Sequence, residues 1–322
     1  MELLSANFGK NITFVRPAYF IISGFIGLPN MKYYYVLLFF AFIISIFGNT
    51  AVMSLIYLDP NLKTPKFVAV FNLAFVDLLG STALVPKVID IFLFNNYSIT
   101  YRDCLTFFFF CYSFLSMQSL NLVALSYDRL MAIMFPLRYH VKVTHKNMLS
   151  LILFFWLFVF ISNLVAVGFL TRLSFCKSVV INSYFCDYGQ IFRLACNNYF
   201  PNFVIGHMIP CFVLWLPLGI ILFSYISIGH ALAKVATFEE RVKAFKTCTA
   251  HLSLVAIYYF PILITFAMYG RMHQNARIVN LSIPAVVPPM LNPIIYVLQT
   301  QEIKLSIKKL IKIKRKPKVT VK

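Results

Sequence analysis

Residues 33–58 have the sequence YYYVLLFFAFIISIFGNTAVMSLIYL, which contains no charged side chain. A helix needs about 20 mostly apolar residues to cross the hydrocarbon layer of a membrane, so this stretch is long enough to span it. Further runs of the same kind follow along the chain. The sequence therefore predicts an all-α membrane protein in one domain, a seven-transmembrane helix bundle with spans at residues 33–58, 67–94, 105–135, 148–170, 201–235, 244–270 and 278–298. Residues 1–32 precede the first span, and residues 299–322 form a tail.

The composition of the whole chain agrees with this interpretation. Of its 322 residues, 60% are hydrophobic and only 12% are charged, and the mean hydropathy is +0.80. A soluble domain carries roughly 25% charged residues, which excludes an ordinary cytosolic enzyme, and the abundance of Phe and Tyr excludes a disordered chain. The net charge of +19 does not indicate nucleic-acid binding, because the basic residues stand between apolar runs. We expect no removable signal peptide, because no early apolar segment with a cleavage site precedes the first span.

Charge and glycosylation motifs predict the orientation in the membrane. Basic residues near the span ends are similar in number on the two sides, but the tail is rich in lysine. Because cytoplasmic segments carry an excess of Lys and Arg, we expect the tail inside and the amino terminus outside. Glycosylation motifs at Asn11 and Asn96 then lie outside. In the tail, Ile303, Ile307 and Leu310 recur at helical spacing, which favours an amphipathic helix on the anionic inner leaflet over a simple stop-transfer cluster.

Polar side chains interrupt three of the apolar runs. Asn49 lies in the first span, Asp77 in the middle of the second, and Asn292 in the seventh, one turn before Tyr296. Such groups are costly in hydrocarbon and usually functional. They could meet around a water or an ion. Alternatively, each could bond to a neighbouring backbone carbonyl near a proline kink.

A charged pair, Asp128 and Arg129, stands at the inner end of the third span. A basic residue at the end of a span is often only a topological anchor. The adjacent acid and the following Pro136-Leu137-Arg138-Tyr139 favour a further role for this pair.

The seven cysteines divide by the side of the membrane on which they are expected. Four lie on the outer, oxidising side, where disulfides persist, and their residues alone allow three pairings. The other three are expected to be free thiols that pack as small hydrophobic groups. The outer set is Cys104, Cys176, Cys186 and Cys196, and the free set is Cys111, Cys211 and Cys248.

Several motifs, in this order and on these spans, resemble the rhodopsin-like (class A) G-protein-coupled receptors. They are Gly48-Asn49, Asp77, Asp128-Arg129 and Asn292-Pro293-Ile294-Ile295-Tyr296. Longer stretches resemble the olfactory (odorant) receptors within that family, and the resemblance covers nearly the whole chain. These stretches are LSYDRLMAI at 125–133 with PLRY at 136–139, KAFKTCTAHL at 243–252 and PPMLNPIIY at 288–296. The chain looks closest to the odorant receptors of fish.

The resemblance implies an odorant-activated receptor that couples to a stimulatory G protein of the olfactory type and raises cAMP. It implies a plasma-membrane location, in the cilia of olfactory sensory neurons, and neither a cofactor nor an enzymatic activity. It also implies disulfides Cys104–Cys186 and Cys176–Cys196, and a sodium site at Asp77, although this chain has Gln118 where many olfactory receptors carry Glu. The residues that it assigns to activation and G-protein coupling are Asp128, Arg129, Tyr225, Asn292, Pro293 and Tyr296.

The family's ligand cavity lies between the outer halves of the third, fifth, sixth and seventh spans, and the side chains there are mainly apolar and aromatic. Such a site suits a small organic odorant held mainly by burial, although each residue could instead serve helix packing. The candidate ligand-binding residues are Phe107, Phe108, Cys111, Tyr112, Leu115, His207, Cys211, Tyr259, Ile262, Leu263, Phe266, Ser282 and Ala285.

Other functions fit the sequence less well. Residues 105–121 contain no carboxylate to pair with an amine ligand, and residues 278–298 contain no lysine that could bind retinal. A transporter would show internal repeats, and none is found. An intramembrane enzyme would need an acidic or His partner for Asp77 at similar depth. A non-olfactory class A receptor for another small ligand stays open, and a membrane transporter is the more remote alternative.

Overall fold

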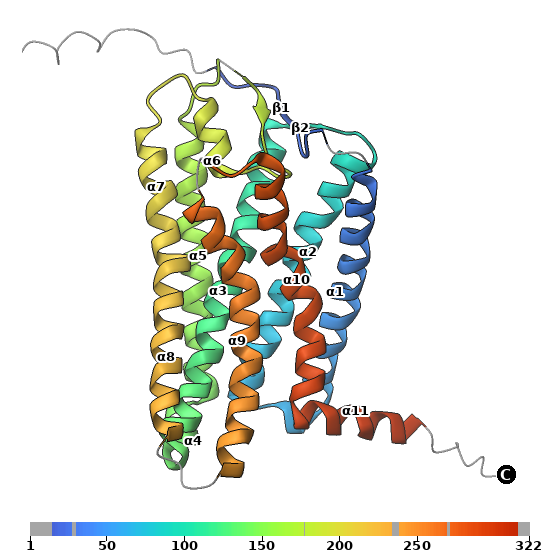
Figure 1. Ribbon diagram of the computed structural model, residues 1–322, viewed down its shortest axis with the longest axis vertical. Helices are drawn as coiled ribbons and strands as arrows, with labels where there is room; N and C mark the ends of the chain where they lie inside the picture. Colours follow the sequence, from blue (N-terminus) through green and yellow to red (C-terminus); the bar gives the residue numbers. More distant parts are fainter. Residues whose placement is uncertain (1–14, 28–29, 177, 234–237, 269–270, 315–322) are drawn as a thin grey trace, which may run out of the picture.

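A bundle of long helices forms the body of the protein (Figure 1). The structure, a computed structural model, describes residues 15–27, 30–176, 178–233, 238–268 and 271–314. Within these ranges seven helical segments lie side by side, which confirms the predicted fold class. They are α1 (Lys32–Leu58), α2 (Pro65–Leu93), α3 (Tyr101–Met134), α5 (His145–Thr171), the continuous segment of α7 (Phe200–Pro210), η4 (Cys211–Trp215) and α8 (Leu216–Ala233), α9 (Phe238–Ala267) and α10 (Gln274–Gln299).

Several helices extend beyond the apolar runs that predicted them. The third begins at Tyr101 instead of residue 105, because the Thr100 hydroxyl accepts a hydrogen bond from the Asp103 amide and caps the helix. The sixth begins at Phe238 instead of residue 244, so its first turns are charged. Residues 234–235 and 269–270, where the fifth and sixth spans were expected to end, lie outside the described residues.

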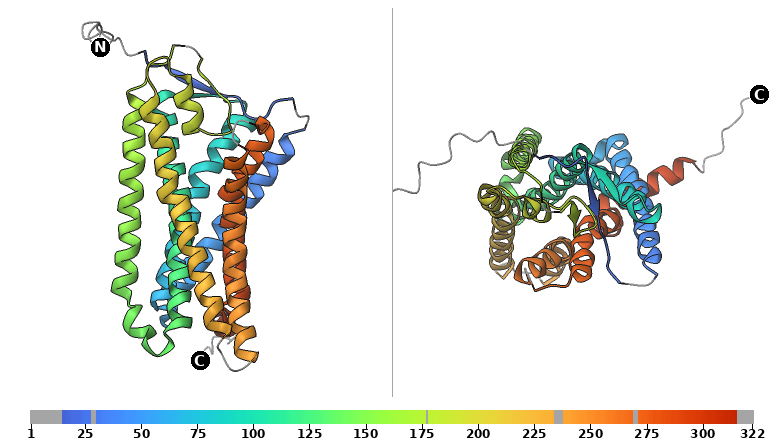
Figure 2. Two further views of the ribbon diagram at one scale, coloured as in Figure 1. Left: turned by 60° about the vertical axis from the view of Figure 1, so that its left-hand side comes forward. Right: turned by 90° about the horizontal axis from the view of Figure 1, so that it is seen from above.

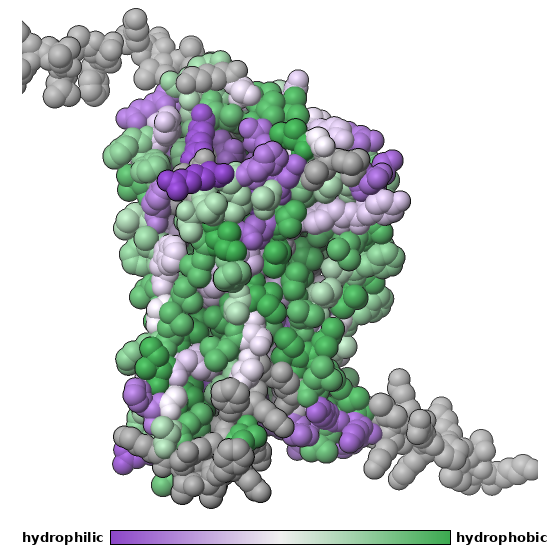
Figure 3. Space-filling view, viewed as in Figure 1, coloured by the Kyte–Doolittle hydropathy of each residue, from purple (hydrophilic) through white to green (hydrophobic). Residues whose placement is uncertain are grey.

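The side surface of the bundle, between its two ends, is apolar. Among the residues that the structure describes, six helices are long and apolar enough to cross a membrane, and α9 contributes the shorter apolar segment His251–Ala267. Large hydrophobic side chains such as Phe47, Leu153 and Phe223 are exposed on this face. Figure 3 shows a hydrophobic band between hydrophilic ends. A surface of this kind suits lipid tails, and with the family shown below it indicates a multi-pass membrane protein.

A small sheet covers one end of the bundle, which we call the sheet end. Strand β1 (Tyr19–Ile22) lies between β2 (Ser98–Thr100), to which it is antiparallel, and β3 (Val180–Ile181), to which it is parallel. Viewed from above, the strand crosses the end of the bundle (Figure 2). Residues before α1 thus join the α2–α3 connection to the long α5–α7 connection.

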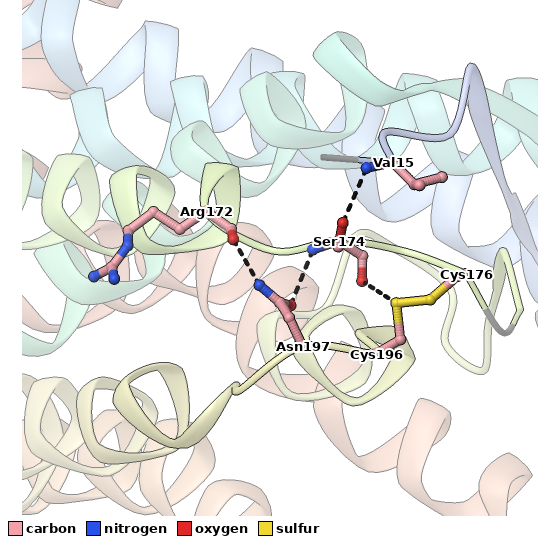
Figure 4. Close-up of a disulfide and its surroundings, with 6 residues drawn as sticks. All are labelled: Val15, Arg172, Ser174, Cys176, Cys196 and Asn197. Atoms are coloured by element: carbon pink, nitrogen blue, oxygen red, sulfur yellow. Dashed lines mark hydrogen bonds between the residues drawn. A yellow bond between two sulfur atoms is a disulfide. The ribbon is translucent and has the colours of Figure 1, made fainter. Parts of the chain in front are cut away.

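Two disulfides fix the α5–α7 connection, with the pairing that the resemblance implies. Cys104 at the start of α3 is joined to Cys186, and their Cα atoms are 5.6 Å apart. Cys176 is joined to Cys196, with Cα atoms 5.9 Å apart. Figure 4 shows Ser174 beside the second bridge, where its backbone amide donates to the Asn197 side chain at 3.0 Å. The connection is therefore closed on itself and tied to the bundle.

The opposite end of the bundle, the α11 end, carries the tail helix. Helix α11 (Gln301–Lys314) begins after α10 at this end and projects sideways, away from the bundle (Figure 1). The Lys66 ammonium lies 3.2 Å from a Glu302 carboxylate oxygen, and Ile303 is buried against the bundle. Short turns η1 (Pro60–Leu62), η2 (Pro136–Arg138) and α4 (Tyr139–Lys142) complete this end.

The close approach of α1 to α10 depends on Gly48. A Cβ atom at this position would lie 2.9 Å from two carbons of the Pro293 ring. A proline ring has little freedom to move away. Only glycine therefore allows the two helices to keep their present separation.

We expect Gly48→Ala to separate α1 from α10 and to lower the free energy of unfolding by about 1–3 kcal/mol, the usual cost of overpacking. Thermal unfolding of the detergent-solubilised protein measures this. Gly219→Ala is the matched control, because a Cβ there meets no atom within 4 Å. Equal unfolding temperatures for the two variants would contradict the packing argument.

Candidate functional site

A polar cluster lies in the middle of the bundle, around the fully buried Asp77 of α2. Gln118 of α3 donates to one carboxylate oxygen through Nε2 at 2.9 Å, and Asn292 of α10 donates to the other through Nδ2 at 2.6 Å. Two of the three polar positions singled out in the sequence therefore meet directly. Asn49 instead donates to the Pro289 backbone carbonyl at 2.9 Å, as the alternative interpretation of that residue predicts.

Two amide oxygens of this cluster have no hydrogen-bond partner among the described residues. They are Oε1 of Gln118 and Oδ1 of Asn292, whose amide nitrogens both face Asp77. Buried oxygens without donors are costly. Carboxylate and amide oxygens are also the ligands that hard cations prefer, so the residue types fit a small cation such as sodium. Both amides turn their nitrogens toward Asp77, however, and must turn over before their oxygens can share a cation with the carboxylate.

A second group of polar residues lies at the α11 end. Tyr139 donates its hydroxyl hydrogen to a carboxylate oxygen of Asp128 at 2.6 Å, and burial together with this bond raises the pKa of Tyr139. The Tyr225 hydroxyl of α8 lies 2.7 Å from Nδ1 of His251 on α9. These contacts join α3 to α4 and α8 to α9, at the end of the bundle where the predicted coupling residues Asp128 and Tyr225 lie.

Many of the predicted ligand residues lie together beneath the sheet. Phe107, Phe108, Cys111 and Ala285 are buried in one hydrophobic cluster, here called the sheet-end cluster, and Tyr112 and Leu115 pack against it. Ser282 is also buried and accepts a hydrogen bond from Tyr34 of α1. Tyr259 and Ile262 belong instead to the neighbouring cluster nearer the α11 end, in which Tyr259 lies 2.6 Å from the Ser119 hydroxyl.

The structure turns other candidates away from the sheet-end cluster. His207 and Cys211 are exposed, while Ile205 and Ile209 of the same helix pack inward. Phe266 of α9 is 36% exposed and contacts Trp215 of η4, and Leu263 is half-buried. His207 and Cys211 were both expected to line the ligand cavity between the helices, whereas the structure leaves their side chains exposed.

The olfactory receptor family model matches residues 38–314. The chain belongs to the olfactory receptor family. It is 33% identical to mouse olfactory receptor 8G17 over 91% of this chain and 96% of that protein. It is also 33% identical to human olfactory receptor 51I1, over 94% of this chain and 97% of that protein.

A solved structure shows the same fold. Squid rhodopsin superimposes with a TM-score of 0.69 at 19% sequence identity, covering 90% of this chain and 88% of that one. At this level of sequence identity the match shows the fold alone. Together with the family, it identifies the chain as a G-protein-coupled receptor and not an enzyme.

This olfactory receptor also contains an ion pair that the sequence analysis did not single out. Asp187, directly after the disulfide-bonded Cys186, lies 3.1 Å from Nη1 of Arg277 at the start of α10. The two side chains are 8% and 18% exposed. Their separation along the chain gives no sequence signal, and only the path of the α5–α7 connection brings them together.

We expect Asp77→Ala to destabilise the receptor by about 2–5 kcal/mol, because it leaves the side-chain donors of Gln118 and Asn292 unpaired in the interior. Asp77→Asn keeps one acceptor and should cost less. Surface expression and thermal unfolding in detergent measure both variants. If Asp77→Ala matched wild type in both assays, the cluster would not be a stabilising element.

Proposed function

We propose that this receptor binds a small organic odorant at the sheet-end cluster and activates a stimulatory, olfactory-type G protein, which raises cAMP. The burial of Phe107, Phe108, Cys111 and Tyr112 beneath the α5–α7 connection is the observation that supports the ligand site best. Apolar surface removed from water contributes roughly 25 cal/mol per Å², so an apolar odorant gains affinity mainly from burial there.

The proposed ligand site keeps the candidates that the structure gathers at this end. These are Phe107, Phe108, Cys111, Tyr112, Leu115, Ser282 and Ala285, with Tyr259 and Ile262 next to it. His207, Cys211, Leu263 and Phe266 enter only if the helices rotate on ligand binding. Each contact can be tested by alanine replacement.

Activation, in this proposal, is a shift between two arrangements of the helices. A ligand that binds one arrangement better raises its population. Asp128 and Arg129 on α3, Tyr225 on α8, and Asn292, Pro293 and Tyr296 on α10 would rearrange together and open a surface for the G protein. The direct bond from Asn292 to Asp77 supports a coupling between α10 and α2.

The proposed orientation places the sheet end outside the cell and α11 at the cytoplasmic face. The disulfides at the sheet end support it, because such bonds persist in an oxidising environment. Asn96, an exposed residue beside β2, would then be open to glycosylation, and Asn11 lies outside the described residues. We also propose the plasma membrane of sensory cilia as the location. A particular likeness to fish odorant receptors stays a prediction.

We further propose sodium binding at Asp77. The carboxylate would hold the ion together with Oε1 of Gln118 and Oδ1 of Asn292, the two oxygens without donors among the described residues, once both amides turn over so that these oxygens replace the nitrogens beside Asp77. The ion would supply positive charge to a buried carboxylate. Replacing sodium by choline should lower the unfolding temperature of wild type and leave Asp77→Asn unchanged. An equal response of both proteins would count against the site.

We expect Arg129→Ala to abolish odorant-evoked cAMP in transfected cells while surface expression persists. The reason is that Arg129 is the proposed contact with the G protein. Arg138→Ala is the matched control, since this arginine is exposed in η2, the short turn that follows α3. The assay requires an odorant panel first, read by a cAMP reporter.

Other outcomes would favour the alternatives. A cAMP response that survives Arg129→Ala would contradict the proposed coupling. A response confined to ligands that are not odorants would favour a receptor for another small ligand. Ligand-dependent current or flux without a G protein would favour transport.

A further inference from the structure

The ion pair of Asp187 and Arg277 lies over the sheet-end cluster, on the side of the α5–α7 connection. We call this pair the polar ceiling of the cluster. Asp187 accepts a hydrogen bond from the Gly189 amide through Oδ1 at 2.8 Å and pairs with Arg277 through Oδ2. The second terminal nitrogen of Arg277 donates to the Asn182 backbone carbonyl at 2.8 Å. Side chain and backbone thus hold both charged groups in fixed positions.

Tyr112 of α3 lies directly below this pair. Its hydroxyl is 3.5 Å from Oδ1 of Asp187, a long contact for a hydrogen bond between oxygens. Its ring lies against Phe108 at 4.7 Å and Phe185 at 5.8 Å, measured between ring centroids. The hydroxyl therefore lies at the boundary between the apolar cluster and the ion pair, and its hydrogen bond to Asp187 is weak.

The carboxylate of Asp187 is already approached by three donors, from Gly189, Arg277 and Tyr112. A ligand ammonium or other donor would have to compete with these donors, which are already in place. The group that can turn toward a ligand is instead a donor, the Tyr112 hydroxyl, and the fixed guanidinium of Arg277 adds positive charge beside it. The ceiling therefore favours a ligand that offers an acceptor.

Charge decides which acceptor fits. Asp187 and Arg277 neutralise each other, so a carboxylate ligand would leave one uncompensated negative charge in a mostly apolar site. Burying an unpaired charge is far more costly than burying a carbonyl that receives a hydrogen bond. A neutral acceptor carries no such cost.

We infer that this receptor selects neutral carbonyl compounds, such as ketones, aldehydes and esters, by a hydrogen bond from Tyr112 that Arg277 supports. Asp187 is a positioning residue, which neutralises Arg277 and thereby excludes ionised acids. The inference rests on the proposed function and specifies the ligand class of the same site.

The experiment measures cAMP responses to straight-chain and branched probes of equal carbon number, as methyl ketone, aldehyde, primary amine and carboxylic acid. We expect wild type to respond to the carbonyl compounds at the lowest concentrations. Tyr112→Phe keeps the ring and should weaken the ketone response by roughly three- to tenfold, the usual worth of one neutral hydrogen bond. Tyr184→Phe is the matched control, because the Tyr184 hydroxyl already donates to the Leu281 carbonyl at 3.2 Å.

Asp187→Asn provides a second test with a gain of response. It keeps an oxygen for the Gly189 amide but leaves the charge of Arg277 unbalanced, so a carboxylate ligand now neutralises it. We expect the potency of the acid relative to the ketone to rise by about tenfold or more. Surface labelling confirms that each variant reaches the membrane, and if Asp187→Asn does not, Tyr112→Phe alone decides.

The outcomes separate the two proposals. Preferred responses to acids or amines, or a ketone response unchanged by Tyr112→Phe, would overturn the inference and leave the odorant receptor function intact. A surface-expressed wild type that responds to no probe and to no odorant of a broad panel would overturn the proposed function, and the inference with it.

Discussion

The hydrogen bond from Asn49 to the carbonyl of Pro289 shows the constraint on which the bundle depends. In an α-helix the Pro289 carbonyl would accept from the backbone nitrogen four residues on, which belongs to Pro293 and carries no hydrogen. Water is absent from the hydrocarbon layer, so a freed carbonyl must find a donor inside the protein. Asn49 supplies it from α1 at 2.9 Å, and Gly48 beside it makes room for the Pro293 ring.

The same solution recurs between α3 and α8. Pro217 removes the donor that the Val213 carbonyl would use, and the Ser119 hydroxyl donates to this carbonyl instead, at 2.6 Å. Because the single hydrogen of Ser119 is committed there, the Tyr259 hydroxyl must be the donor in its 2.6 Å contact with Ser119. The hydrogen bond that satisfies the Val213 carbonyl thus also fixes the Tyr259 side chain of α9, next to the proposed ligand site.

These constraints explain what could be predicted from the sequence. Long apolar runs predict the spans, and polar residues inside them, such as Asp77 and Asn292, predict contacts within the bundle because lipid offers them no partner. Helical phase is harder to predict. The fifth segment is apolar on all sides, so its sequence does not distinguish the inward Ile205 and Ile209 from the outward His207 and Cys211. The π-helical turn η4 within it shifts the phase again.

The ceiling over the sheet-end cluster follows from a different kind of constraint. Its ion pair joins residues far apart in sequence, and no periodic pattern links Asp187 to Arg277. Its geometry depends on the Cys104–Cys186 disulfide, which places Asp187 above α3, and on β1, which holds the connection through β3. Membrane physics therefore specifies the bundle, whereas covalent and β-sheet links outside the bundle set the polar groups that face a ligand. Ligand selectivity can then change through Asp187 and Arg277, since this pair lies apart from the hydrogen bonds that join the helices deeper in the bundle.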